Sequence, residues 1–159
     1  MLRSMKFLTA FAALALPAAA FAQPEVVSDS GDTAWVLTAS ALVLMMTIPG
    51  LALFYGGLVR AKNVLSIFMH CFLITCVVSL FWAIIGYSLV FGDGSSLIGR
   101  GENAMLANLA DLREGLTIPE STFALFQMTF AIITPALVVG AFVERIRFGW
   151  VVAFSLIWS

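Results

Sequence analysis

The sequence predicts an all-α fold, a polytopic bundle of membrane-spanning helices. Of its 159 residues, 62% are hydrophobic and only 11% are charged, a far more apolar balance than soluble domains have. The apolar residues form three runs, each long enough to cross a bilayer core about 30 Å thick as a helix. A net charge of -1 leaves no basic surface for nucleic acid, so we expect no nucleic-acid partner.

The first 22 residues have the order of a secretory signal peptide. A positive start, an apolar stretch and a small-x-small cleavage site follow one another: Arg3 and Lys6, residues 7–19, and Ala20-Phe21-Ala22. We expect cleavage after Ala22, which leaves residues 23–159 as the mature chain with its N-terminus outside the cytoplasm. The alternative is an uncleaved first membrane helix, which Pro17 and the short apolar stretch disfavour.

The first predicted span covers residues 35–58 and contains no charged residue. Pro49 and Gly50 interrupt its second half, where the proline removes a backbone donor and leaves the carbonyl of Met45 without its helical partner. Such a break is tolerated in a membrane only where neighbouring protein covers it. The break therefore indicates a helix that belongs to a bundle.

The second predicted span covers residues 64–91, long enough to cross the membrane with some tilt. Trp82 and Tyr87 lie near its end, and we expect them at the membrane–water interface, where these residue types are enriched. Residues 92–120 are rich in glycine, asparagine and acidic side chains. They indicate a water-exposed loop, with a short helix expected around residues 104–112.

The third predicted span covers residues 122–143 and contains Pro135. A fourth apolar run, residues 149–159, is too short to cross a bilayer as a helix. Ala136 and Gly140 on the third span have the spacing of small residues that let helices approach closely, as do the glycines of the first span. These small residues favour a compact bundle over isolated anchors.

The basic residues predict which ends of the spans face the cytoplasm. Four of the six that remain after signal cleavage lie in the two short turns between spans one and two and after span three: Arg60, Lys62, Arg145 and Arg147. By the positive-inside rule both turns face the cytoplasm. The signal peptide independently gives the same topology, because it places the mature N-terminus outside.

Few residues within the spans have reactive side chains. His70 lies near the cytoplasmic end of span two, where we favour a neutral, hydrogen-bonded histidine over a functional one, because a buried imidazolium needs a partner. Cys71 and Cys76 are about 140° apart on a helix, which suits neither a shared metal nor a disulfide, so we expect small apolar fillers. With no paired histidines and no Ser-His-Asp set, we expect no enzyme activity, metal or cofactor.

Span three carries aromatic residues at helical spacing. Phe126 and Phe130 are four residues apart and share one face of the helix, with Gln127 and Thr134 close by. Aromatic faces that line a pore can hold a cation, and apolar rings can dewet a constriction. The chain has fourteen phenylalanines, so the pattern alone favours packing, with pore lining as the alternative.

Two segments closely resemble the ammonium transporter family. The first is TIPGLALFYGGLVR at residues 47–60, followed by KNVLS at residues 62–66, and the second is FQMTFAIITPAL at residues 126–137, continuing through residue 148. Both occur in the right order with the right topology. The resemblance covers residues 33–159, roughly the first third of a family member, and the signal peptide suits bacterial members.

The resemblance implies an eleven-helix subunit of a homotrimer in the bacterial inner membrane, with a pore in each protomer that conducts ammonium or ammonia. It assigns Phe130 to the pore gate and Phe126 to the outer vestibule. The family's vestibule tryptophan, its conserved aspartate and its two pore histidines would lie after Ser159, and Trp158 lies too early to be that tryptophan. We therefore expect the first three helices and the start of the fourth, a fragment that does not conduct alone.

The resemblance also implies a cytoplasmic partner, the trimeric PII nitrogen-regulatory protein that many family members bind. Two other function classes remain as alternatives. An ammonium sensor of the same fold would carry a signalling domain, whereas a structural subunit of a membrane enzyme complex is disfavoured by the two matching segments.

Overall fold

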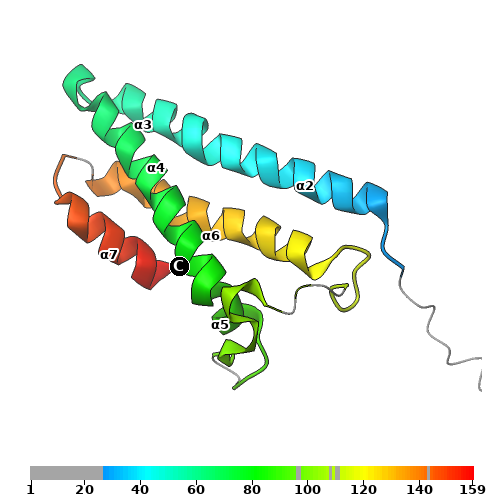
Figure 1. Ribbon diagram of the computed structural model, residues 1–159. Helices are drawn as coiled ribbons and strands as arrows, with labels where there is room; N and C mark the ends of the chain where they lie inside the picture. The colour runs from blue at the N-terminus through cyan, green and yellow to red at the C-terminus, as the bar shows by residue number, and fades with distance from the viewer. Residues whose placement is uncertain (1–26, 96–97, 108, 110–111, 143) are drawn as a thin grey trace, which may run out of the picture.

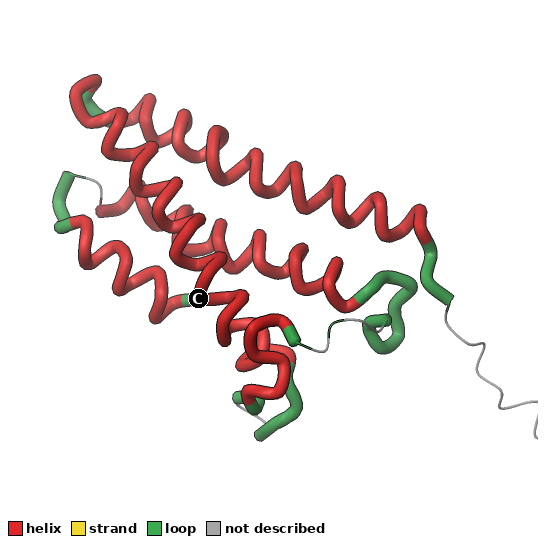
Figure 2. The backbone as a smooth tube through the Cα atoms, viewed as in Figure 1, coloured by secondary structure: helices red, strands yellow, loops and turns green. Residues whose placement is uncertain are grey.

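The computed structural model describes residues 27–95, 98–107, 109, 112–142 and 144–159 (Figure 1). The predicted signal peptide and its cleavage site lie outside these residues. Three helical stretches are long and apolar enough to cross a membrane, Ser30–Leu58, Ala61–Phe91 and Glu120–Phe142. Within the described residues the structure has helices and loops but no strand, apart from two isolated bridges (Figure 2). The predicted all-α fold is confirmed.

The first long helix consists of three parts, α2 (Ser30–Met45), a π-helical segment η2 (Met46–Leu51) and α3 (Ala52–Leu58). It begins earlier than the apolar run because Asp29 caps it, its carboxylate accepting hydrogen bonds from the backbone N–H groups of Gly31 (2.7 Å) and Asp32 (2.9 Å). This start is tied to the long loop, because Asp29 N donates to Thr117 O (2.9 Å) and the Thr117 hydroxyl donates to the Asp32 carboxylate.

Pro49 lies inside η2, so the predicted break takes the form of a wider helical turn rather than an end of the helix. Thr47 and Ala52, on the inner side of this region, are fully buried. Pro49 and Gly50 themselves are exposed within the part of the chain that the structure describes. Within the described structure, neighbouring protein, which we expect to cover this break in the helix, therefore covers its inner side only.

The second long helix begins with a single 3₁₀ turn η3 (Ala61–Asn63) and continues as α4 (Val64–Phe81), η4 (Trp82–Gly86) and α5 (Tyr87–Phe91). The π-helical segment η4 contains no proline and is not predicted by the sequence pattern. Instead of facing lipid headgroups, as expected, Trp82 and Tyr87 are buried inside the protein. The indole N–H of Trp82 finds its partner there, donating to the carbonyl of Ala124 (3.1 Å).

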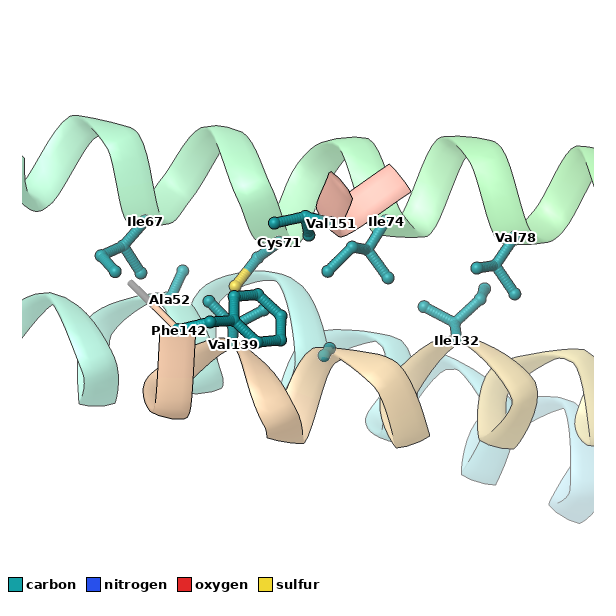
Figure 3. Packing of buried hydrophobic residues seen from close by; sticks show 10 residues of the cluster. Ala52, Ile67, Cys71, Ile74, Val78, Ile132, Val139, Phe142 and Val151 are labelled. Atoms are coloured by element: carbon teal, nitrogen blue, oxygen red, sulfur yellow. The ribbon is translucent and has the colours of Figure 1, made fainter. Parts of the chain in front are cut away.

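The third long helix, α6 (Glu120–Phe142), lies beside both α2 and α4, and the short helix α7 (Phe148–Trp158) packs against α4 (Figure 1). The main buried cluster between α4 and α6 consists of apolar side chains. Figure 3 shows one row of α4 side chains facing residues of α3, α6 and α7: Ile67, Cys71, Ile74 and Val78 opposite Ala52, Ile132, Val139, Phe142 and Val151. Cys71 is a fully buried filler and Cys76 is half-buried, and both are free thiols, as predicted.

The long loop contains a 3₁₀ segment, η5 (Gly101–Leu106), in place of the short helix expected around residues 104–112. Met105 and Leu106 have positive φ angles of 59° and 56°, in a region that cannot continue a right-handed helix. Part of the expected range, at positions 108, 110 and 111, lies outside the described residues.

The bundle has two distinct ends. The loop end holds the starts of α2 and α6 and the loop of residues 92–119, whereas the turn end holds the turns at residues 59–63 and 144–147 (Figure 1). The two turns are linked, because the side chain of Asn63 donates a hydrogen bond to the carboxylate of Glu144. Both basic turns thus lie on one side of the bundle, as the positive-inside count requires.

Candidate functional site

Phe126 and Phe130, the two candidate site residues, lie one turn apart on α6. Their ring centroids are 5.0 Å apart with an angle of 71° between the planes, an edge-to-face arrangement. Phe126 is half-buried, whereas 43% of Phe130 is exposed. Because Phe130 is partly exposed, its ring is accessible to a cation or to an apolar side chain.

Phe130 lines a cavity of about 270 Å³. Gln127 and Thr134, next to it on α6, place two polar side chains on the same wall. The other walls come from η4, from α5 and from the end of the chain at α7: Trp82, Val90, Phe91, Trp158 and Ser159. Phe126 is absent from the lining, so the structure brings the two phenylalanines into contact but places only Phe130 on the cavity.

Arg113 is a residue that the sequence reasoning missed, and it contacts Phe91, one of the residues that line this cavity. Its guanidinium carbon lies 5.2 Å from the ring centroid of Phe91 and 4.6 Å from that of Phe123, so two aromatic faces cover it. Its Nη1 donates to Glu120 Oε1 at 2.8 Å. Glu120 also accepts a hydrogen bond from the hydroxyl of Tyr87.

Arg113 and Glu120, called the outer ion pair below, are brought together by the backbone of the loop. The N–H of Arg113 donates to Ile118 O (3.1 Å), and Leu112 pairs with Pro119 in an isolated antiparallel bridge. Their side chains are 29% and 14% exposed, so water reaches them only in part. Seven residues of separation in a loop carry no periodic signal, which is why sequence reasoning did not connect them.

The turn end holds a second cavity and a pair of opposite charges. A cavity of about 680 Å³ lies between α3 and α6, lined by residues that include Tyr55, Arg60 and Gly140. Arg60 Nη2 lies 3.8 Å from Glu144 Oε2. The hydrogen bond from Asn63, together with the charge of Arg60, lowers the pKa of Glu144 below its ordinary value.

His70 lies away from the cavity that Phe130 lines. It is buried, its Nδ1–H donates to the carbonyl of Ser66, and its ring packs edge-on against Phe148 at 5.1 Å. This hydrogen-bonded, packed position agrees with the structural interpretation of His70 rather than with a functional one.

Comparison with known proteins points to one family. The sequence profile of the Ammonium Transporter Family matches residues 34–159. The chain is 48% identical over 133 residues to the ammonium transporter of Bacillus subtilis, covering 81% of this chain, and 42% identical over 133 residues to that of Aquifex aeolicus, covering 82%.

Solved structures give the same result. The crystal structure of Candida albicans Mep2 superposes with a TM-score of 0.70 at 38% identity over 82% of this chain. The chain spans 32% and 31% of the length of the two bacterial relatives and 29% of the Mep2 chain.

Proposed function

This chain belongs to the ammonium transporter family, and we propose that it forms the first part of a pore that conducts ammonium or ammonia through each subunit. The chain is a multi-pass membrane protein by its apolar helices and its family. The observation that carries the proposal is the exposed ring of Phe130, which lines a cavity beside Gln127 and Thr134 in a chain 48% identical to an ammonium transporter.

The chemistry of these side chains suits a small cation that must lose its water. The ring faces of Phe126 and Phe130 hold ammonium at the entrance by cation–π attraction. The ring of Phe130 then forms an apolar constriction, which disfavours a hydrated ion and favours a small or neutral species. Because no covalent bond of the substrate changes beyond a proton equilibrium, the proposed activity is transport rather than enzyme catalysis.

The membrane and the orientation follow from the charges. We propose that residues 1–22 are a signal peptide, that the protein lies in a bacterial inner membrane, and that the loop end faces the periplasm. Mass spectrometry of the purified protein should find Gln23 as the first residue. An intact Met1 would contradict the signal peptide.

The assembly proposed is a homotrimer whose cytoplasmic face binds a PII nitrogen-regulatory protein. The turns at residues 60–63 and 144–147 lie together at one end of the bundle, and this is the surface proposed for the contact. Chemical cross-linking in native membranes should give a trimer. The relatives reported above are named for transport, so the alternative of an ammonium sensor is not favoured.

The proposal is tested with the complete protein reconstituted in liposomes. An inward ammonium gradient should produce a current or a change of internal pH that protein-free vesicles lack. An equal gradient of potassium should produce neither signal, which controls for leak. A complete, folded protein whose vesicles respond to ammonium no more than empty vesicles would contradict the proposed function.

A further inference from the structure

The outer ion pair touches the wall of the candidate pore through a single ring. Phe91 lines the same cavity as Phe130, and the guanidinium carbon of Arg113, which does not line it, lies over the Phe91 ring at 5.2 Å from its centroid. Arg113 in turn contacts Glu120 at 2.8 Å. A permanent positive charge is therefore one aromatic ring away from the space that ammonium is proposed to enter.

We propose that Glu120 neutralises Arg113 at the loop end of the pore, so that the guanidinium can hold Phe91 and Phe123 in place without repelling ammonium. This inference rests on the proposed function of the cavity. It assigns Glu120 and Arg113 as positioning residues that set the apparent affinity for the cation and do not contact it.

The guanidinium of Arg113 packs against two aromatic rings, but its positive charge would repel ammonium. Its planar group lies 4.6 Å from the Phe123 centroid and 5.2 Å from that of Phe91, which fixes both rings and the loop that carries Arg113. Arginine remains charged at any physiological pH, so its charge is removed from the pore only by a partner. Glu120 supplies that partner, and the Tyr87 hydroxyl holds the carboxylate in position.

The outer ion pair should affect the occupancy of the cavity by a cation more than the other charged residues of the loop do. With one ring between them, the guanidinium of Arg113 and an ammonium ion in the cavity would be about 10 Å apart. At that distance a unit charge changes the occupancy of a cation site about two- to four-fold in a partly aqueous setting. The side chain of Glu120 is only 14% exposed, so solvent screens it incompletely. The other charged side chains described in the loop, Asp93, Arg100, Glu102 and Glu114, belong to exposed residues that water and salt screen more strongly.

The experiment measures the half-saturating ammonium concentration of the complete protein in liposomes at low ionic strength. Glu120→Gln should raise it about two- to four-fold, because the positive charge of Arg113 is then uncompensated. Arg113→Gln should lower it, because the carboxylate remains alone. The double variant Arg113→Gln/Glu120→Gln should return close to the wild-type value, and added salt should shrink the differences between the variants.

Two controls separate this charge effect from damage to the fold. Glu114→Gln makes the same change of charge at an exposed position of the loop and should leave the half-saturating concentration unchanged. Maximal flux normalised to protein reports structural damage. If Glu120→Gln does not reach the membrane, the comparison of Arg113→Gln with the double variant still measures the effect of the carboxylate.

The outcomes are distinct. A double variant whose half-saturating concentration is as far from the wild-type value as that of the single variants would overturn the proposal and leave the pair with a structural role alone. Unchanged half-saturation in both single variants would overturn it as well. A wild-type protein that carries no ammonium would overturn both the proposed function and this inference.

Discussion

The ring of Tyr55 lies directly against the backbone of Gly140. A methyl group at Gly140 would lie 2.5 Å from Tyr55 Cε1 and 2.8 Å from Cδ1. The ring cannot easily move away, because its hydroxyl donates a hydrogen bond of 2.6 Å to the carbonyl of Leu137 on the same helix. The first and third long helices are thus joined near the turn end by a tyrosine lying on a glycine.

Gly140→Ala should destabilise the complete protein by about 1–3 kcal/mol, the usual effect of overpacking a close contact. Unfolding of the detergent-solubilised protein followed by circular dichroism measures it. Gly57→Ala is the matched control, because beyond its chain neighbours and its own helix backbone no described heavy atom lies within 4 Å of the added methyl, and alanine is the better helix former. Equal stability of the two variants would contradict the close packing at Gly140.

Phe130→Ala should raise the half-saturating ammonium concentration about two- to five-fold, because a cation–π contact at an accessible site contributes about 0.5–1 kcal/mol. Flux into liposomes at a series of ammonium concentrations measures it. Phe72→Ala is the control, since Phe72 is 55% exposed on α4 and does not line the cavity. Phe123→Ala is a poor control because that ring covers Arg113. If both variants have the same small effect, Phe130 serves packing alone.

Ala61→Cys should react with thiol reagents from the cytoplasm only. Ala61 is exposed in the turn that also carries Arg60 and Lys62, and such basic turns remain on the cytoplasmic side. Labelling intact cells and inverted vesicles with an impermeant maleimide distinguishes the sides. Reaction at this position in intact cells would reverse the predicted topology.

The contact between Glu144 and its partners should weaken in acid. The hydrogen bond from Asn63 and the charge of Arg60 lower the pKa of Glu144, so its contribution to stability is present above the ordinary carboxyl pKa and is lost as pH falls through the lowered value. The difference in unfolding temperature between wild type and Glu144→Gln should therefore be present at neutral pH and vanish in strong acid. A difference that persists at low pH would contradict a role for the ionised carboxylate.

The helical bundle was predictable because long apolar runs in a membrane have to satisfy their own backbone groups, which a helix does. The start of α2 at Ser30 was missed, although Asp29 followed by a helix-compatible run is a recognisable cap. The π-helical turn at Trp82–Gly86 was missed for a different reason. This segment contains no proline, and it lies where Trp82 of the second helix donates a hydrogen bond to Ala124 of α6.

The candidate site was predictable in part. Helical spacing alone indicates that Phe126 and Phe130 share a face, and the structure brings their rings into contact. The helical spacing does not indicate that Phe130 lines the cavity while Phe126 does not, because the cavity is formed together with α5 and α7. The contact of Arg113 with Glu120 depends on a loop whose Gly115 has a φ of +75°, and no pattern of apolar residues encodes such a turn.

Three hydrogen bonds between residues far apart in the sequence also set an order of events during synthesis. Tyr55 bonds to a residue 82 positions later, Asn63 to one 81 later, and Asp32 to one 85 later. A ribosome adds about 5–20 residues per second, so each partner is made roughly 4–16 s after the group it satisfies. The first two helices are therefore synthesised before the partners of these polar groups, and the three hydrogen bonds form only after the chain has reached residues 117–144.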